Sequence, residues 1–161
     1  MGQLYEIACA IDATCPQTQL AVVTGRNQRL RGQLETTDWN VPTYVYGFVE
    51  HTSEMPCLMS AANLLITKAG PGTIHEAFLA GLPLILSGAI PGQEEGNVRL
   101  VIENDAGAWA PDPHQIASLV AHWTSESDGI LASMTVRSRA LARPDAAALV
   151  AHEVWQLITS L

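Results

Sequence analysis

The residues best suited to chemistry in this chain lie between Thr67 and Asn97. Gly70 and Gly72 form a turn between an apolar stretch at 64–66 and a predicted helix that begins near Thr73. Glycine takes backbone angles closed to other residues and lets a ligand approach the main chain. Because the first amides of a helix have no partner inside it, they attract anions. The turn therefore predicts a phosphate-binding site.

Two further groups of polar residues suit the hydroxyls of a sugar. Glu76 lies about one turn inside the predicted helix, where its carboxylate can accept hydrogen bonds from a ribose. The segment Pro91–Asn97, with two carboxylates and two amides, follows a second apolar strand at 84–86. Ligands of open α/β sheets bind at the carboxyl ends of the strands. Together these residues predict a site for a phosphate joined to sugars.

These motifs resemble the carboxyl-terminal domain of monogalactosyldiacylglycerol synthases and bacterial diacylglycerol glucosyltransferases. More distantly, they are similar to the lipid-linked N-acetylglucosaminyltransferase of peptidoglycan synthesis. The resemblance extends from Gly2 to about Pro111 and is carried by Thr67–Thr73, Glu76-Ala77, Gly81-Leu82-Pro83 and Pro91–Asn97.

The resemblance implies the carboxyl-terminal half of a GT-B glycosyltransferase, which holds the nucleotide-sugar donor. Gly47–Val49 would receive the uracil, Gly70–Thr73 would lie beside the diphosphate, and Glu76 would bind the ribose. Gln93 and Glu94 would hold the donor hexose. The complete expected donor site is Gly47, Phe48, Val49, Ala69, Gly70, Pro71, Gly72, Thr73, Glu76, Gln93, Glu94 and Asn97. No catalytic residue is assigned, because in the family the base belongs to the amino-terminal domain.

The activity implied is hexosyl transfer from UDP-galactose or UDP-glucose to a diacylglycerol-type lipid. The UDP-sugar would be a donor substrate, with no cofactor and no metal, and the lipid would bind to an amino-terminal domain absent from this chain. One alternative is an isolated UDP-sugar binding module or inactive fragment. Another is a GT-B-like sugar-nucleotide epimerase domain, although the loop Pro91–Asn97 favours lipid glycosylation.

The start of the chain departs from the family. In the family, the donor domain begins with a strand and a glycine-rich turn. In this chain, Met1-Gly2-Gln3 matches only the end of that turn. We therefore expect a domain truncated at its amino terminus, without a central strand of the sheet. The two strands next to the missing one would then either keep backbone groups without hydrogen-bond partners or pair with each other.

Apolar periodicity predicts an α/β chain, which the resemblance specifies as a Rossmann-like three-layer domain with a mostly parallel sheet. Residues 1–161 would form one domain with extra C-terminal helices. Helical stretches are expected at 4–11, 28–34, 55–62, 97–104, 115–123, 130–141 and 146–158. Strands are expected at 20–23, 44–49, 64–66, 84–86 and 108–110.

Composition excludes several other classes. A net charge of -8, with only 8 Lys and Arg, argues against a nucleic-acid partner. Three scattered cysteines predict neither a disulfide framework nor a zinc site. No run approaches the ~20 apolar residues of a membrane helix. We expect a cytoplasmic location, with peripheral attachment of the full-length protein to the membrane as an option.

Basic residues near the motifs have two interpretations each. Lys68 either neutralises a diphosphate or is structural. Arg26, Arg29 and Arg31 form either a solvated helix face or a contact with anionic lipid head groups or a partner domain. His75 could touch a phosphate but also fits a surface or packing role.

Overall fold

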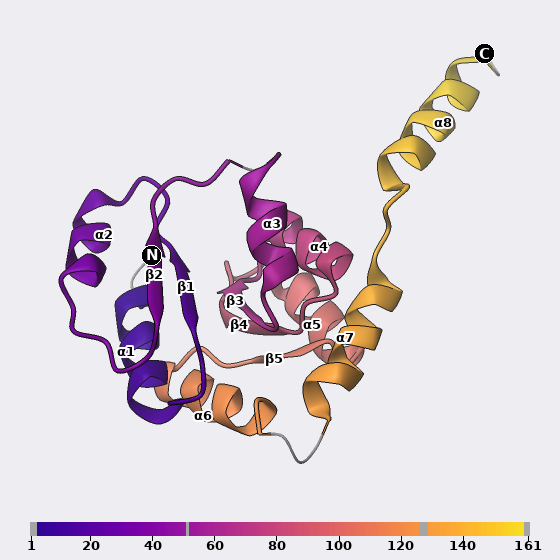
Figure 1. Cartoon of the computed structure of the whole chain (residues 1–161). Helices are drawn as coiled ribbons and strands as arrows, with labels where there is room; N and C mark the ends of the chain where they lie inside the picture. The colour runs from indigo at the N-terminus through magenta and orange to yellow at the C-terminus, as the bar shows by residue number, and fades with distance from the viewer. Residues whose placement is uncertain (1–2, 51, 126–128, 160–161) are drawn as a thin grey trace.

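The computed structural model describes residues 3–50, 52–125 and 129–159. Helices and strands alternate through most of the chain (Figure 1). The strands are β1 (Leu20–Val23), β2 (Thr43–Tyr46), β3 (Leu65–Lys68), β4 (Leu84–Gly88) and β5 (Gly107–Trp109). The helices are α1 (Leu4–Thr14), α2 (Gln28–Glu35), α3 (Glu54–Ala61), α4 (Pro71–Ala80), α5 (Glu95–Glu103), α6 (Pro113–Trp123), α7 (Ile130–Leu141) and α8 (Ala146–Thr159). The predicted α/β class is confirmed.

Every strand pairing among the described residues is parallel, but the strands form two separate sheets. β1 pairs with β2, with Leu20 opposite Thr43, and β3, β4 and β5 form the second sheet in that order. Within the described chain β1 and β3 do not pair with each other. Within the described residues, one edge each of β1 and β3 is therefore left without a partner strand.

Strand β4 shows how the helices cover both faces of the three-stranded sheet. Successive side chains of a strand point to opposite faces. Ile85 packs in a cluster with residues of α1 and α6, whereas Leu84 and Leu86 pack with residues of α4 and α5. All three are fully buried. The result is the predicted three-layer arrangement, with a continuous apolar strand at its centre.

A buried polar contact joins the residues just after α4 to the C-terminal half of α7. Gly81 ends α4 in the left-handed region (φ 74°), a conformation that favours glycine. The next carbonyl, of Leu82, accepts a 2.8 Å hydrogen bond from the Ser138 hydroxyl, and Ser138 is fully buried. This bond holds α7 against α4.

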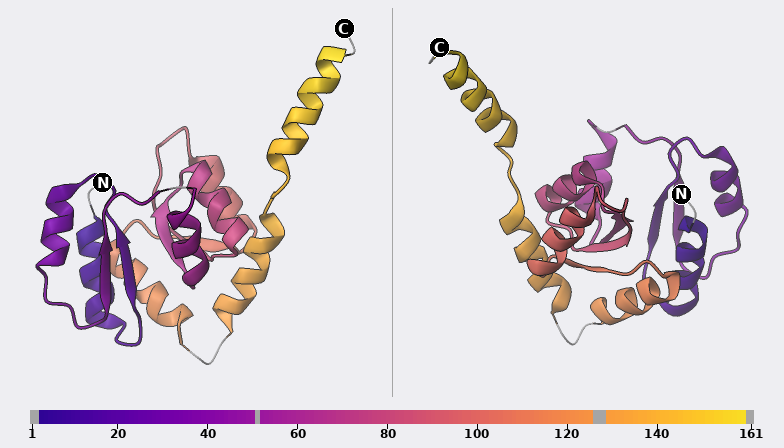
Figure 2. Two further views of the ribbon diagram at one scale, coloured as in Figure 1. Left: turned by 45° about the horizontal axis from the view of Figure 1, so that its top comes forward. Right: turned by 180° about the vertical axis from the view of Figure 1, so that it is seen from behind.

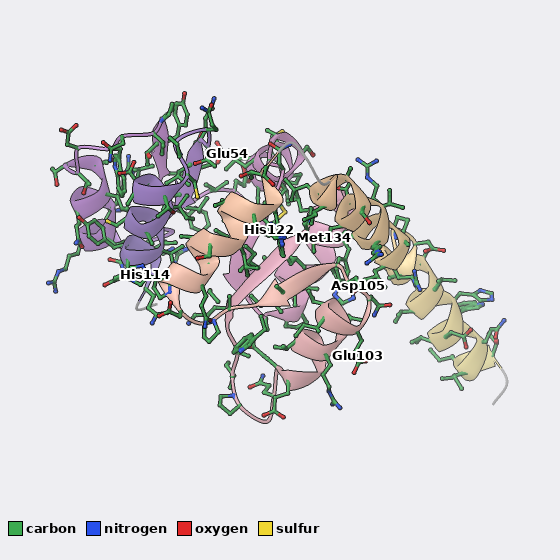
Figure 3. The ribbon with its side chains drawn as sticks, turned by 90° about the horizontal axis from the view of Figure 1, so that it is seen from below. Glu54, Glu103, Asp105, His114, His122 and Met134 are labelled. Atoms are coloured by element: carbon green, nitrogen blue, oxygen red, sulfur yellow. The ribbon has the colours of Figure 1, made fainter. Side chains whose placement is uncertain are left out.

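The last two helices differ in how they contact the domain. Asp105, just after α5 and labelled in Figure 3, forms a 2.7 Å ion pair with Arg137 of α7. By contrast, α8 extends away from the other elements in every view (Figures 1 and 2), and none of its described residues is buried. The three predicted C-terminal helices are present.

Several predicted element boundaries shift by a few residues, and three of these lie in segments predicted to hold the donor. α4 begins at Pro71 rather than near Thr73, because proline presets the φ of a first helical residue and loses no hydrogen bond there. β2 ends at Tyr46, so the following residues belong to a turn rather than to the strand. α5 begins at Glu95, two residues earlier than predicted.

Candidate functional site

The turn between β3 and α4 presents free backbone donors. Gly70 is the residue before the helix, and no side chain caps the amides of the first turn. Pro71 has no N–H, and Ile74 N already donates to Gly70 O at 3.1 Å. Among the described residues, the amides of Gly72 and Thr73 therefore remain as donors at the positive end of the helix dipole. This geometry suits an anion such as a phosphate.

The two glycines of this turn do not need their conformational freedom. Neither Gly70 nor Gly72 has a positive φ, so the predicted use of backbone angles closed to other residues is wrong. A Cβ at Gly70 would lie 4.0 Å from Glu94 Oε1, and one at Gly72 would meet nothing within 4 Å. The glycines instead leave the main chain uncovered, so a ligand can approach the amides directly.

The loop between β4 and α5 is held in one conformation by its own acidic residues. Glu94 Oε2 accepts from Ile90 N at 2.7 Å, and Glu95 Oε1 accepts from Gly92 N at 3.1 Å. Gly92 has φ 75°, which favours glycine. Glu94 is 9% exposed. One oxygen of its carboxylate is thus committed to the loop, while Oε1 faces the Gly70 turn.

Asn97 joins this loop to the turn before α4. Its side-chain amide donates to Ala69 O at 2.8 Å, and Ala69 is fully buried. With Glu94 Oε1 close to Gly70, this bond brings together residues that lie 28 positions apart in the sequence. The structure therefore assembles Ala69, Gly70, Glu94 and Asn97 into one site.

Glu76 lies in the crevice between α3 and α4. Together with Met55, Met59 and Leu79 it lines a cavity of about 230 Å³. Glu76 is half-buried, and the other residues that line the cavity bring thioether and aliphatic groups next to it. A ribose in this cavity would meet the carboxylate with its hydroxyls and the methionines with its carbon atoms. The sequence did not indicate Met55 and Met59, because methionines in a short helix are typical of any core.

The segment Gly47–Val49 belongs to the unit formed by β1 and β2. Val49 is buried, and Phe48 is 64% exposed. Gly47 O accepts from Gly25 N at 3.2 Å, and Arg31 packs so closely on Gly47 that a Cβ there would lie 2.8 Å from its guanidinium. No hydrogen bond in the described parts of the chain joins this segment to the β3–α4 turn or to the β4–α5 loop.

The remaining predicted residues are on the surface. The side chain of Gln93 is exposed next to Glu94. Its backbone N–H donates to Ile90 O at 3.1 Å. Lys68 is exposed at the end of β3. His75 Nδ1 lies 2.8 Å from Pro71 O and its ring meets Phe78 edge-on, which fits the packing interpretation.

A larger hollow, of about 630 Å³, lies over α6 and is lined by residues that include Trp109, His114 and His122. The two histidines are labelled on α6 in Figure 3. None of the predicted donor residues lines it. Across the described ranges, no cluster of three or more His, Cys, Asp or Glu could hold a metal ion. In the same ranges no helix has the length and apolar character needed to cross a bilayer.

Comparison of the amino-acid sequence with known proteins identifies relatives of this chain. Residues 5–106 match the C-terminal domain of glycosyltransferase family 28. The chain is 43% identical over 143 residues to the chloroplastic monogalactosyldiacylglycerol synthase of Spinacia oleracea, covering 89% of this chain and 27% of that protein. It is 40% identical over 140 residues to monogalactosyldiacylglycerol synthase 1 of Arabidopsis thaliana, covering 87% and 26%. The chain thus spans about a quarter of the length of these relatives.

Structure comparison agrees. The crystal structure of MurG from Acinetobacter baumannii matches with a TM-score of 0.70 at 18% identity, covering 99% of this chain and 47% of that one. The glycosyltransferase of kitacinnamycin matches with a TM-score of 0.60, also at 18% identity, covering 94% and 39%. The fold is that of the carboxyl-terminal, Rossmann-like domain of GT-B glycosyltransferases. The chain belongs to glycosyltransferase family 28, of which it contains the C-terminal domain.

Proposed function

We propose that this chain is the donor-binding part of a hexosyltransferase that moves a sugar from UDP-galactose or UDP-glucose to a diacylglycerol-type lipid. The observation that carries the proposal is the hydrogen bond from Asn97 to Ala69 O, which joins the β4–α5 loop to the phosphate-binding turn. A diphosphate at this turn would place the attached sugar next to that loop. Similarity to monogalactosyldiacylglycerol synthases supports a glycolipid product.

In this proposal each part of the site acts on a different part of the donor. The amides of Gly72 and Thr73, with the helix dipole, stabilise the negative charge that develops on the departing diphosphate. Glu76 accepts hydrogen bonds from the ribose hydroxyls. Gln93 and Glu94 hold the hexose, with Glu94 oriented by its bond to Ile90 N. The base that activates the acceptor hydroxyl and the site for the lipid belong to an amino-terminal domain.

The location follows from the acceptor. A diacylglycerol-type lipid has its hydroxyl at a membrane surface, so the complete enzyme must work there. We propose that it is a peripheral protein of the membrane face on which UDP-sugars are available, which is the cytoplasmic face in a bacterium.

The test is calorimetry of the purified chain with UDP, UDP-galactose and UDP-glucose. We expect saturable binding of UDP and a preference for one of the two sugars. Glu76→Ala should weaken UDP binding by about 2–3 kcal/mol, because charge-assisted hydrogen bonds to the ribose are lost. The matched control is Glu103→Ala, which removes an exposed carboxylate from the end of α5 (Figure 3) and should leave binding unchanged.

Two results would contradict the proposal at different levels. No UDP binding by a chain that unfolds cooperatively would refute donor binding by this domain. UDP binding with the same dissociation constant in Glu76→Ala as in the wild type would retain the domain's function and remove Glu76 from the site.

A further inference from the structure

Helix α8 carries an exposed apolar face and projects from the domain (Figures 1 and 2). Val150, Val154 and Ile158 follow one another at intervals of four residues, so their side chains share one side of the helix. They are 63%, 51% and 63% exposed, and Trp155 next to them is 65% exposed. We call these four residues the apolar face of α8. Large apolar side chains that are exposed together mark an interaction site.

The other side of α8 is polar. Gln156 Nε2 lies 2.8 Å from His152 Nε2, one helical turn away, and Thr159 continues this side. A helix with one apolar and one polar side suits the boundary between water and an apolar phase. The 14 residues of α8 correspond to a length of about 21 Å, so the helix can lie along such a boundary.

The positive charge of the chain is concentrated just before α8. Three of the 8 Lys and Arg lie at 137–143, whereas only two of the 16 Asp and Glu, Asp145 and Glu153, follow residue 128. Arg139 and Arg143 are exposed. Arginines close to a membrane are attracted to anionic lipid head groups. The C-terminal part of the chain therefore combines an apolar face with positive charge, in contrast to the acidic remainder.

We infer that the apolar face of α8, together with Arg139 and Arg143, binds the surface of a membrane that contains anionic lipids. The helix lies in the plane of that surface, with its apolar face among the acyl chains and Trp155 at the level of the head groups. A second copy of α8 would also cover the apolar face. It would bring only one carboxylate of its own, that of Glu153, to the arginines, whereas an anionic surface satisfies both features.

The inference rests on the proposed function, which requires the complete enzyme to reach a lipid acceptor at a membrane. It assigns the surface of this chain that makes the attachment. The acidic residues of the domain oppose binding only weakly, because α8 extends away from the other elements (Figure 1). Charges separated by more than about 10 Å are largely screened at 0.1 M salt.

The experiment measures co-sedimentation of the purified chain with vesicles of phosphatidylcholine, alone or mixed with phosphatidylglycerol. We expect tighter binding to the mixed vesicles. Val154→Glu should weaken this binding on the order of tenfold, because the burial of one valine side chain is lost. The matched control is Gln156→Glu, which adds the same charge on the polar side of α8 and should bind within about twofold of the wild type.

A second pair of variants tests the arginines. Arg143→Gln should weaken binding to the mixed vesicles about fivefold and leave binding to phosphatidylcholine unchanged. Its control is Arg29→Gln, which removes the same charge from an exposed position of α2 and should bind like the wild type. All four variants should keep the thermal unfolding and the UDP binding of the wild type, because the replaced side chains are exposed and lie outside the proposed donor site.

The outcomes separate this inference from the proposed function. A wild-type chain that binds neither kind of vesicle would overturn the inference, and so would equal losses in Val154→Glu and Gln156→Glu. A dimer in analytical ultracentrifugation that Val154→Glu abolishes, without any vesicle binding, would assign the apolar face to a second copy instead. Equal binding to the two kinds of vesicle would overturn the role of the arginines. Vesicle binding by a chain that binds no UDP would refute donor binding alone.

Discussion

Replacing Asn97 with aspartate should destabilise the domain by about 2 kcal/mol. The wild-type amide donates to Ala69 O at 2.8 Å, and Ala69 is fully buried. Aspartate has nearly the same shape but an ionised carboxylate cannot donate, so the carbonyl would lose its side-chain partner. A buried acceptor without a partner costs about 1–3 kcal/mol. Repulsion between the carboxylate and the carbonyl oxygen acts in the same direction.

The assay is thermal and urea unfolding of wild type, Asn97→Asp and Asn97→Ala. A loss of about 2 kcal/mol corresponds to a decrease in Tm of roughly 4–8 °C for a domain of this size. The matched control is Asn104→Ala, which removes an exposed amide that donates to Leu100 O at 2.9 Å. That variant should change stability by less than about 0.5 kcal/mol, as surface substitutions usually do.

The reasoning has a clear point of failure. If both Asn97 variants unfold at the same temperature and urea concentration as the wild type, the bond does not hold the two loops together. If Asn97→Ala and Asn104→Ala lose the same stability, burial of the acceptor has no special cost at this position. Either result would remove the observation on which the proposed donor site depends.

Two other substitutions test the site and the packing beside it. Gln93→Ala should weaken the binding of UDP-galactose or UDP-glucose about tenfold in calorimetry and leave the binding of UDP unchanged. An equal loss of affinity for UDP and for the UDP-sugar would refute a contact between Gln93 and the hexose. Ser138→Ala should lower the free energy of unfolding in urea by about 1–2 kcal/mol, because Leu82 O loses its buried hydrogen-bond donor. The control Ser133→Ala, on the exposed side of α7, should have no effect. Equal stability of the two variants would argue that the bond does not link α7 to α4.

The class of the protein was determined by local sequence. A short apolar strand, a glycine turn and a helix are encoded by neighbouring residues, so the β3–α4 unit could be predicted, with the helix start placed two residues late. The same holds for α5, where the predicted start was two residues late. The anion-binding chemistry of such a unit depends on the free amides of a helix, which follow from the helix itself.

The conformation of individual residues within these motifs was less predictable. Gly70 and Gly72 were expected to adopt angles reserved for glycine, but the glycines with a positive φ are Gly25, Gly81, Gly92 and Gly129. A glycine can be required either by its backbone angle or by the space that a side chain would fill. Only the path of the surrounding chain distinguishes the two cases, and the sequence does not contain that path.

Tertiary structure alone decided which residues meet. The contact of Asn97 with Ala69, and that of Arg26 with Phe48, each join segments more than 20 residues apart, and they depend on how neighbouring strands pair. The same is true of Glu76, which faces α3 because the two helices pack together. The sequence by itself therefore determined the chemical groups available for a nucleotide-sugar, because types and spacing are local properties. Their arrangement into a site was decided by strand order and helix packing, which are properties of the whole chain.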